Sequence, residues 1–377
     1  MSNISRRTFG LAIMGPLGMN HALPLRPLPL DQQSELEGGN GSITDVPGVK
    51  VGHYTDPRRP TGCTAIVFED GATAGVDYDG SAPGEFQVVM LQPVSSLSTV
   101  WAIVLSGGDS WGLSTALGAM RYLEERGLGE HWWPDKPHMV MPIVVASILD
   151  DLGLGDSSIR PDAESGYKAC KVATSGPVEE GCVGAGAGAT VGTGSYCGGL
   201  GMKSGIGTAS LRVKDFVIGA IMAVNATGDI VDWVQGKIIA GARREDGKGF
   251  VNISENVKKQ MARQLKNKMV SEIRPAQKHT TIGVIATNAV FNKTELTRIA
   301  MLANTGAAKA INPYHTTEDG DQLYAVSTGK LKVGLNLAWV GILAAEVVAA
   351  AITRAAKMAT SVEGWPAYRD FTLKFSQ

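Results

Sequence analysis

QKHTTIGVIATNAV, residues 277–290, opens with a polar cluster and two threonines and continues as an apolar run. Threonine, isoleucine and valine are β-branched, so the run predicts a buried strand that begins at Thr280. A threonine hydroxyl is also a potential nucleophile, but it needs a neighbouring base. If the chain were cut before Thr280, its own α-amine, with a reference pKa of about 7.7–8.0, could act as that base. The residues alone therefore leave two interpretations of Thr280, an ordinary strand opening or a nucleophile exposed by cleavage.

Strand and helix patterns alternate on both sides of this run. Asn292 can cap a helix with Glu295 three residues later, and residues 336–358 predict a long alanine-rich helix. Strands are expected over residues 49–53, 65–68, 88–91, 102–105, 140–146, 216–224 and 323–327, and a helix over 113–126. The charged segment 242–278 predicts either a solvated helix over 255–270 or a mobile connector. Such interleaving predicts an α/β layered architecture.

The composition limits the class of protein. The chain has 377 residues, of which 44% are hydrophobic and 19% charged, an ordinary globular balance. A formal net charge of −1 gives no overall attraction to nucleic acid or to an anionic membrane. The 4 cysteines show no CxxC spacing, which argues against a zinc site and against a dense disulfide framework.

Residues 1–40 have the features of an export signal followed by a flexible tail. Arg6 and Arg7 precede a short apolar stretch and a proline-rich run, a pattern typical of twin-arginine signals. This predicts a periplasmic protein, and the alternative is a disordered tail on a cytoplasmic one. Residues 337–352 are also apolar, but they include Glu346 and many alanines, so they predict a buried core helix and not a membrane span.

GDSWG, residues 108–112, matches the G-x-S-x-G pattern of a nucleophile elbow and lies between an expected strand and an expected helix. A serine α/β-hydrolase would then need an acid followed by a histidine, and Asp229 and His315 occur in that order. The alternative is a glycine-rich turn in which Ser110 caps the helix.

Two more segments admit a structural and a functional interpretation. GAGAGATVGTG, residues 184–194, lacks the spacing of a phosphate-binding loop, so it predicts either close backbone packing or a pocket wall. EDGD, residues 318–321, lacks the further oxygen ligands of a calcium loop. It is either a polar turn or a group of carboxylates that holds an ammonium group or orients a base.

Six sequence blocks together resemble one enzyme family. They are ITDVPGVKVGHYTD with TGCTAIVFEDG, AIVLSGGDSWGL, GDSSIRPDAESGYKAC, GAGAGATVG with KSGIGTAS, HTTIGVIATNA, and PYHTTEDGDQLYAVSTG. The family is that of the self-processing L-aminopeptidase D-esterase/amidases, which includes β-peptidyl aminopeptidases and nylon-oligomer hydrolases. The resemblance covers residues 41–358. It implies a four-layer α-β-β-α sandwich of the N-terminal-nucleophile type, a single domain over residues 41–377, no metal or organic cofactor, and a homo-oligomer such as a tetramer.

The resemblance also implies a site. Self-cleavage would fall between His279 and Thr280, giving chains 41–279 and 280–377, and would make Thr280 the nucleophile. Asn225 would stabilise the oxyanion, and Asp319 and Asp321 would contact the nucleophile and its amine. The implied reaction is hydrolysis of N-terminal aminoacyl amide bonds in peptides or small amides.

Three positions depart from the family pattern. His279 stands where relatives often carry Asn, Thr193 where some carry Lys, and Asp150 where an aromatic residue is common. Asp150 and Thr193, with the adjoining Gly192, form the expected pocket. Because the family gives Ser110 no role, the serine-hydrolase interpretation becomes the alternative, together with a catalytically silent family member that only binds its ligand.

Overall fold

The computed structural model describes residues 41–136, 138–267, 279–362 and 364–373. The twin-arginine segment around Arg6 and Arg7 and the last residues of the helix expected over 255–270 lie outside these ranges.

One large sheet dominates the molecule, with the strand order β3-β5-β4-β2-β14-β12-β9-β8 and with β1 paired to β2. Its strands are β1 Lys50–Thr55, β2 Gly62–Asp77, β3 Glu85–Phe86, β4 Thr99–Ser106, β5 Val144–Ile148, β8 Ile206–Val213, β9 Phe216–Asn225, β12 Thr280–Ala289 and β14 Gln322–Leu331. The long strand β2 joins two halves of the sheet. Its first part pairs with β1, its last part pairs with β14, and β4 pairs with both parts across a register shift between Val67 and Ala72.

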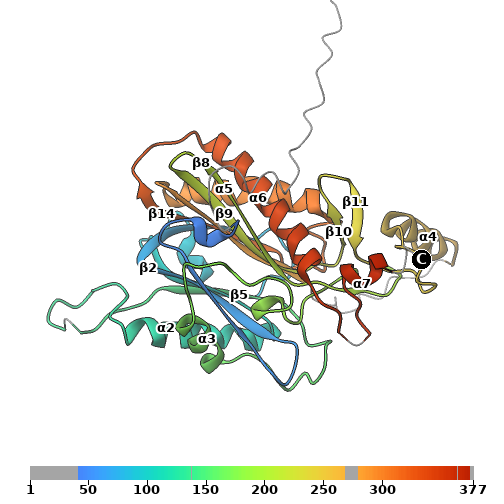
Figure 1. Ribbon diagram of the computed structural model, residues 1–377, viewed down its shortest axis with the longest axis horizontal. Helices are drawn as coiled ribbons and strands as arrows, with labels where there is room; N and C mark the ends of the chain where they lie inside the picture. The colour runs from blue at the N-terminus through green and yellow to red at the C-terminus, as the bar shows by residue number, and fades with distance from the viewer. Residues whose placement is uncertain (1–40, 137, 268–278, 363, 374–377) are drawn as a thin grey trace, which may run out of the picture.

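Three apolar clusters separate four layers. The helices are α2 Thr115–Glu124, α3 Ala163–Lys171, α5 Lys293–Ala310 and α6 Leu337–Met358. A central cluster joins Ile66 and Ile103 of one half-sheet to Ile282 and Tyr324 of the other. A second cluster lies between α5, α6 and the β8–β9–β12 half, and a third between α2, α3 and the β2–β4–β5 half. Figure 1 shows α5 and α6 above the strands and α2 and α3 below them. The expected α-β-β-α sandwich is confirmed.

Short elements complete the fold at the edges. They are β6 Thr190–Val191 with β7 Met202–Lys203, the small sheet of β10 Asp229–Asp232, β11 Lys237–Ala240 and β13 Ile311–Asn312, and the helices α4 Ile253–Asn267 and α7 Tyr368–Leu373. In Figure 1, α4 stands at one end of the molecule, beyond β10 and β11.

Most expected elements are present, and three need correction. The strand expected over 88–91 is wrong: Val88–Leu91 is a 3-10 helix, entered through the left-handed Gln87 (φ 57°). The strand expected over 140–146 begins only at Val144, and Pro142, which has no N–H to donate, precedes it. The helix expected over 113–126 begins with a 3-10 turn, Asp109–Ser114, before α2.

Both long helices start where the sequence predicts. Asn292 accepts the Glu295 N–H at 3.0 Å, and the Glu295 carboxylate accepts the Asn292 N–H at 2.8 Å, which closes the capping box of α5. Asn336 caps α6 by accepting the Ala338 N–H at 2.9 Å. In the part of the chain that the structure describes, α6 is long and apolar enough to cross a membrane, but it packs on β8, β9 and α5 as a core helix.

Candidate active site

The topology brings residues far apart in sequence to one edge of the sheet. β12 and β14 are parallel neighbours, so both begin at this edge, and Thr280 and Asp321 lie at or next to their first residues. β9 runs antiparallel to β12 and ends at the same edge, where Asn225 is directly opposite Thr280. Asp319 joins them because its backbone pairs with that of His279. The four residues predicted for the site therefore converge.

Thr280 contacts the peptide bond expected to be cut. Its side chain is 1% exposed, and its hydroxyl donates to the carbonyl oxygen of His279 at 2.7 Å. The same carbonyl accepts the N–H of Gly320 at 2.8 Å. A Cβ at position 320 would lie 2.2 Å from the Ala82 carbonyl oxygen and 2.9 Å from Thr280 Oγ, so only glycine fits there. The hydroxyl and a backbone donor thus meet on one carbonyl, as an oxyanion site requires.

Asp319 is buried and held by four donors. One carboxylate oxygen accepts the N–H of Thr227 at 3.1 Å and its hydroxyl, and the other accepts the N–H of Thr316 at 3.1 Å and its hydroxyl. This carboxylate is fixed beside Gly320 because both of its oxygens are engaged.

Asp321 is buried between the start of β12 and the side chain of His315. Oδ1 accepts the Thr281 N–H at 2.6 Å, while Oδ2 lies 3.2 Å from Nδ1 of His315 and accepts the His315 N–H at 3.3 Å. Burial raises the pKa of Asp321 to about 6, the His315 hydrogen bond opposes this, and Asp319 adds to it. Burial opposes protonation of His315, but its pKa is raised because the hydrogen bond and charge of Asp321 outweigh the burial.

Asn225 is in place, but its amide points away from the carbonyl of His279. Its Oδ1 accepts the Thr190 N–H at 2.9 Å, and its Nδ2 donates to the main-chain oxygen of Asp150 at 3.0 Å. The oxygen is fixed by a backbone donor, so the amide orientation follows from it. The backbone donor on the His279 carbonyl in this structure is Gly320.

His279, the residue before Thr280, lines a cavity of about 330 Å³. Thr193 Oγ1 lies 3.3 Å from the imidazole, and the His279 N–H donates to the main-chain oxygen of Glu318 at 3.0 Å. Burial lowers the pKa of His279, and the carboxylates of Asp319 and Glu318 oppose the shift. The cavity is lined by Asp150, Asp151, Gly153, Leu154, Gly188, Thr190, Thr193, His279 and Trp365.

Asp150 and Thr193 line this cavity, as expected for a pocket, but Gly192 is not among the lining residues. Gly192 has a φ of 73° and donates its N–H to the Ala226 carbonyl at 3.3 Å, and a Cβ there would lie 2.1 Å from the Ala242 nitrogen. It is a packing glycine. The glycine-rich stretch serves both expected purposes, because other members of it, Gly188 and Thr190, line the cavity.

Lys203 binds main-chain oxygens of this glycine-rich stretch. Its side chain is 0% exposed, and its ammonium group donates to the carbonyl oxygens of Gly186 at 3.2 Å, Ala189 at 2.8 Å and Ser204 at 2.6 Å. Burial lowers the pKa of Lys203. The contact to Ala189 fixes the residue before Thr190, which in turn holds Asn225.

The structure does not assemble a serine triad. The hydroxyl of Ser110 is exposed and donates to Asp109 at 3.1 Å, whereas His315 contacts Asp321 and Asp229 accepts the Ala242 N–H. Ser110 is not a helix cap either, because Gly108 occupies the N-cap position. The expected glycine-rich turn is present, but Ser110 does not cap the helix, and among the described residues no histidine reaches its hydroxyl.

Sequence reasoning missed three groups of the site, Gly320, Thr227 and Thr316, and placed His315 in a serine triad and not beside Asp321. A backbone N–H has no signature of its own, but the glycine between two acids in EDGD was a usable signal. The threonine hydroxyls and His315 act through neighbouring carboxylates, which only the tertiary structure brings to them.

Two solved structures share this fold over nearly the whole chain. The L-aminopeptidase D-Ala-esterase/amidase of Ochrobactrum anthropi, described as a new variant of the Ntn hydrolase fold, superposes with a TM-score of 0.62 at 20% identity and covers 90% of this chain and 95% of its own. A β-aminopeptidase of Burkholderia sp. gives a TM-score of 0.61 at 20% identity with the same coverage. The chain therefore has an N-terminal-nucleophile hydrolase fold.

Residues 41–368 match the model of Peptidase family S58, and the chain belongs to that family. An uncharacterized aminopeptidase of Mycobacterium leprae is 34% identical over 366 residues, covering 87% of this chain and 93% of that protein. A 6-aminohexanoate-oligomer endohydrolase of Kocuria sp. is 27% identical, covering 83% and 85%. The predicted class, an N-terminal-nucleophile hydrolase of peptide or amide bonds, is confirmed.

Proposed function

We propose that this protein is a self-cleaving aminopeptidase or amidase whose nucleophile is Thr280. The observation that carries the proposal is the 2.7 Å hydrogen bond from the Thr280 hydroxyl to the carbonyl of His279, a carbonyl that also accepts the Gly320 N–H. Nucleophile, electrophile and oxyanion donor are in contact in the uncut chain.

In the cleavage step, Thr280 Oγ forms a bond to the His279 carbonyl carbon, and the oxygen that becomes negative keeps the Gly320 N–H. The carbon–nitrogen bond then breaks, and the hydroxyl proton ends on the Thr280 nitrogen. Water hydrolyses the resulting ester, which leaves His279 with a carboxylate and Thr280 with a free α-amine. The products are the proposed chains 41–279 and 280–377.

The same atoms then act on substrate. The free amine of Thr280 takes the hydroxyl proton while Oγ attacks the amide carbonyl, and the amine of the leaving group departs with that proton. Asp321, which accepts the N–H of the adjoining Thr281, holds the amine of Thr280 near its hydroxyl, and Asp319, whose oxygens are engaged by Thr227 and Thr316, acts on that amine through its charge. We assign Asn225 to the substrate oxyanion because it lies across from Thr280 in register, and removal of such a donor typically costs about 10²–10³ in rate. Water releases the acyl group and regenerates Thr280.

The names of the relatives define the substrates to test. Purified protein is assayed with aminoacyl p-nitroanilides, with their N-acetylated counterparts and with 6-aminohexanoate oligomers. We expect hydrolysis of substrates that have a free amine, retention of activity in Thr280→Ser and loss in Thr280→Ala. An active Thr280→Ala variant would contradict the proposal, and a cut protein that hydrolyses nothing in this panel would favour a binding role.

We also propose that the protein is exported to the periplasm and assembles as a homo-oligomer of cleaved pairs. The paired arginines Arg6 and Arg7 support export, and the family resemblance supports assembly. A fusion of residues 1–40 to a reporter should appear in the periplasm, and Arg6→Lys with Arg7→Lys should keep it in the cytoplasm. Light scattering on the cleaved protein tests the assembly, and a mass equal to one pair would contradict it.

A further inference from the structure

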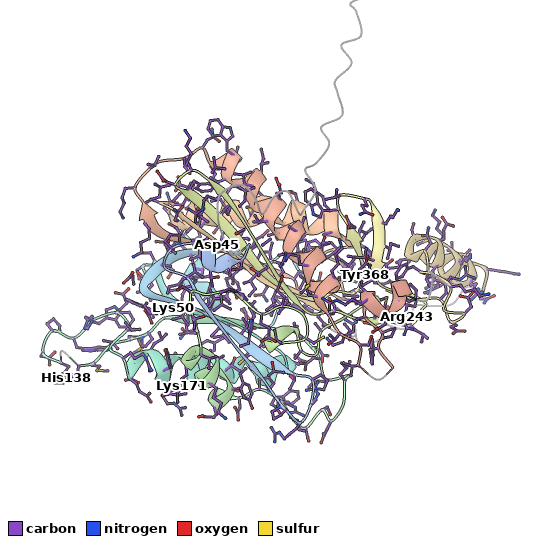
Figure 2. The ribbon with its side chains drawn as sticks, viewed as in Figure 1. Asp45, Lys50, His138, Lys171, Arg243 and Tyr368 are labelled. Carbon is purple, nitrogen blue, oxygen red and sulfur yellow. The ribbon has the colours of Figure 1, made fainter. Side chains whose placement is uncertain are left out.

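The largest of the described cavities is not the one at the nucleophile. It has a volume of about 640 Å³ and lies where α4 leaves the body of the molecule, between the β10–β11 hairpin and the segment that leads into α4. Arg243, labelled in Figure 2, marks this end of the molecule. The lining residues are Tyr196, Asp229, Ile238, Phe250, Val251, Asn252, Ile253, Ser254, Val257, Lys258, Asn312 and Pro313. None of them lines the 330 Å³ cavity around His279, so the two sites have separate walls.

One wall of this cavity carries a buried carboxyl group. Asp229 is 3% exposed, and its Oδ1 accepts the Ala242 N–H at 2.8 Å. Among the described residues it makes no salt bridge, although other buried carboxylates do, such as Asp151 with Arg59 at 2.9 Å. Burial raises the pKa of Asp229 to about 7, and the only opposing contribution is the Ala242 hydrogen bond. The structure thus buries an acid at a cavity wall without a cation to balance it.

The remaining walls are mainly apolar. Ile238, Phe250, Val251, Ile253 and Val257 offer hydrocarbon surface, and the ring of Phe250 is backed by Phe371 with 5.0 Å between centroids. A volume of 640 Å³ falls in the range of sites that take small organic molecules, which are typically apolar with a few placed polar groups. A ligand that complements these walls has a hydrocarbon body and one cationic donor for Asp229.

We propose that this cavity is a second binding site, separate from the nucleophile, for small primary ammonium compounds with an alkyl or aryl body. The ammonium group would donate to the Asp229 carboxylate, and the body would lie against Phe250 and Val257. The site does not depend on the proposed catalytic role of Thr280, because it rests on walls that the nucleophile does not share.

The pH dependence of binding gives the site a signature. Asp229 binds an ammonium group when it is ionised, so affinity falls by about tenfold per unit below pH 7, the region of its pKa. The other ionisable groups around it are Tyr196, Cys197 and Lys258. Burial raises the pKa of Tyr196 above its usual range and that of Cys197 to about 12, so both stay neutral near pH 7. Lys258 is ion-paired with Glu255 at the rim.

The test is calorimetric titration of the purified protein with benzylamine, with benzyl alcohol as the uncharged probe. We expect benzylamine to bind at pH 8, benzyl alcohol to bind at least tenfold more weakly, and Asp229→Asn, which keeps an acceptor for Ala242, to lose at least tenfold in affinity. Val257→Trp should block the site sterically, whereas Ala262→Trp, an exposed position five residues on and turned away from Val257 around the same helix, is the matched control and should bind normally.

Two outcomes would overturn the proposal. One is an absence of saturable benzylamine binding to a folded wild-type protein, which would make Asp229 a purely structural acceptor for Ala242. The other is binding that survives Asp229→Asn and Val257→Trp but is lost in Thr280→Ala, which would place the amine at the nucleophile. Retention of binding in Thr280→Ala supports the second site, whatever that variant does to cleavage.

Discussion

Removing the His315 side chain should shift the pH dependence of activity in a predictable direction. Asp321 sits between the Thr281 N–H at 2.6 Å and Nδ1 of His315 at 3.2 Å. Burial raises the pKa of Asp321 to about 6, and the hydrogen bond and charge of His315 hold it from rising further. A hydrogen bond to a charged group contributes about 1.5–3 kcal/mol, and 1.36 kcal/mol corresponds to one pKa unit. In His315→Ala the pKa of Asp321 should therefore rise by about one to two units.

The proposed mechanism needs an ionised Asp321 to hold the amine of Thr280. The acid limb of the pH–rate profile should therefore shift to higher pH by the same one to two units, roughly. The assay is hydrolysis of an aminoacyl p-nitroanilide between pH 4 and 9, with kcat and KM separated. His315→Asn is the control: asparagine tolerates the left-handed backbone at this position (φ 56°) and keeps a neutral donor near Nδ1, so its shift should be smaller. The reasoning is refuted if His315→Ala lowers the rate equally at every pH.

Three other variants test separate parts of the structure. Asn225→Ala should lower turnover of substrate by about 10²–10³ but spare self-cleavage, because Gly320 and not Asn225 contacts the His279 carbonyl; gel analysis of cleavage beside kinetics checks both. Lys203→Met should lower the free energy of unfolding by about 1–3 kcal/mol, measured by urea denaturation, because it leaves carbonyls of the glycine-rich stretch without their donor. Ser110→Ala should change neither cleavage nor turnover, and a large loss of activity would revive the serine-hydrolase alternative.

The sequence predicted best what is set locally. The strand at Thr280 follows from a run of β-branched residues, and α5 begins at a capping box whose two partners are three residues apart. The same local logic failed over residues 88–91, because a short apolar run fits a strand and a 3-10 turn equally well, and the left-handed Gln87 that decides between them has no strong signature.

The site itself was predictable only through the family resemblance. Asn225, Thr280 and Asp321 meet because the end of β9 lies beside the starts of β12 and β14 in the sheet. No local sequence pattern encodes that pairing of strands. The orientation of the Asn225 amide depends on Thr190 and Asp150, which are 35 and 75 residues away in sequence. Ser110 is the opposite case, because it matches a local motif that the tertiary structure does not complete. Its hydroxyl contacts Asp109 and not a histidine, and the N-cap position is taken by Gly108.

The intact mass of the purified protein shows whether the chain is cut between His279 and Thr280, as the proposed function requires. Intact-mass analysis and N-terminal sequencing of the wild type should give two fragments, one of which begins TTIGV, and Thr280→Ala should give a single uncut chain. An uncut wild-type chain that hydrolyses amides, or a Thr280→Ala chain that is still cut at this bond, would show that Thr280 is not a nucleophile released by self-cleavage.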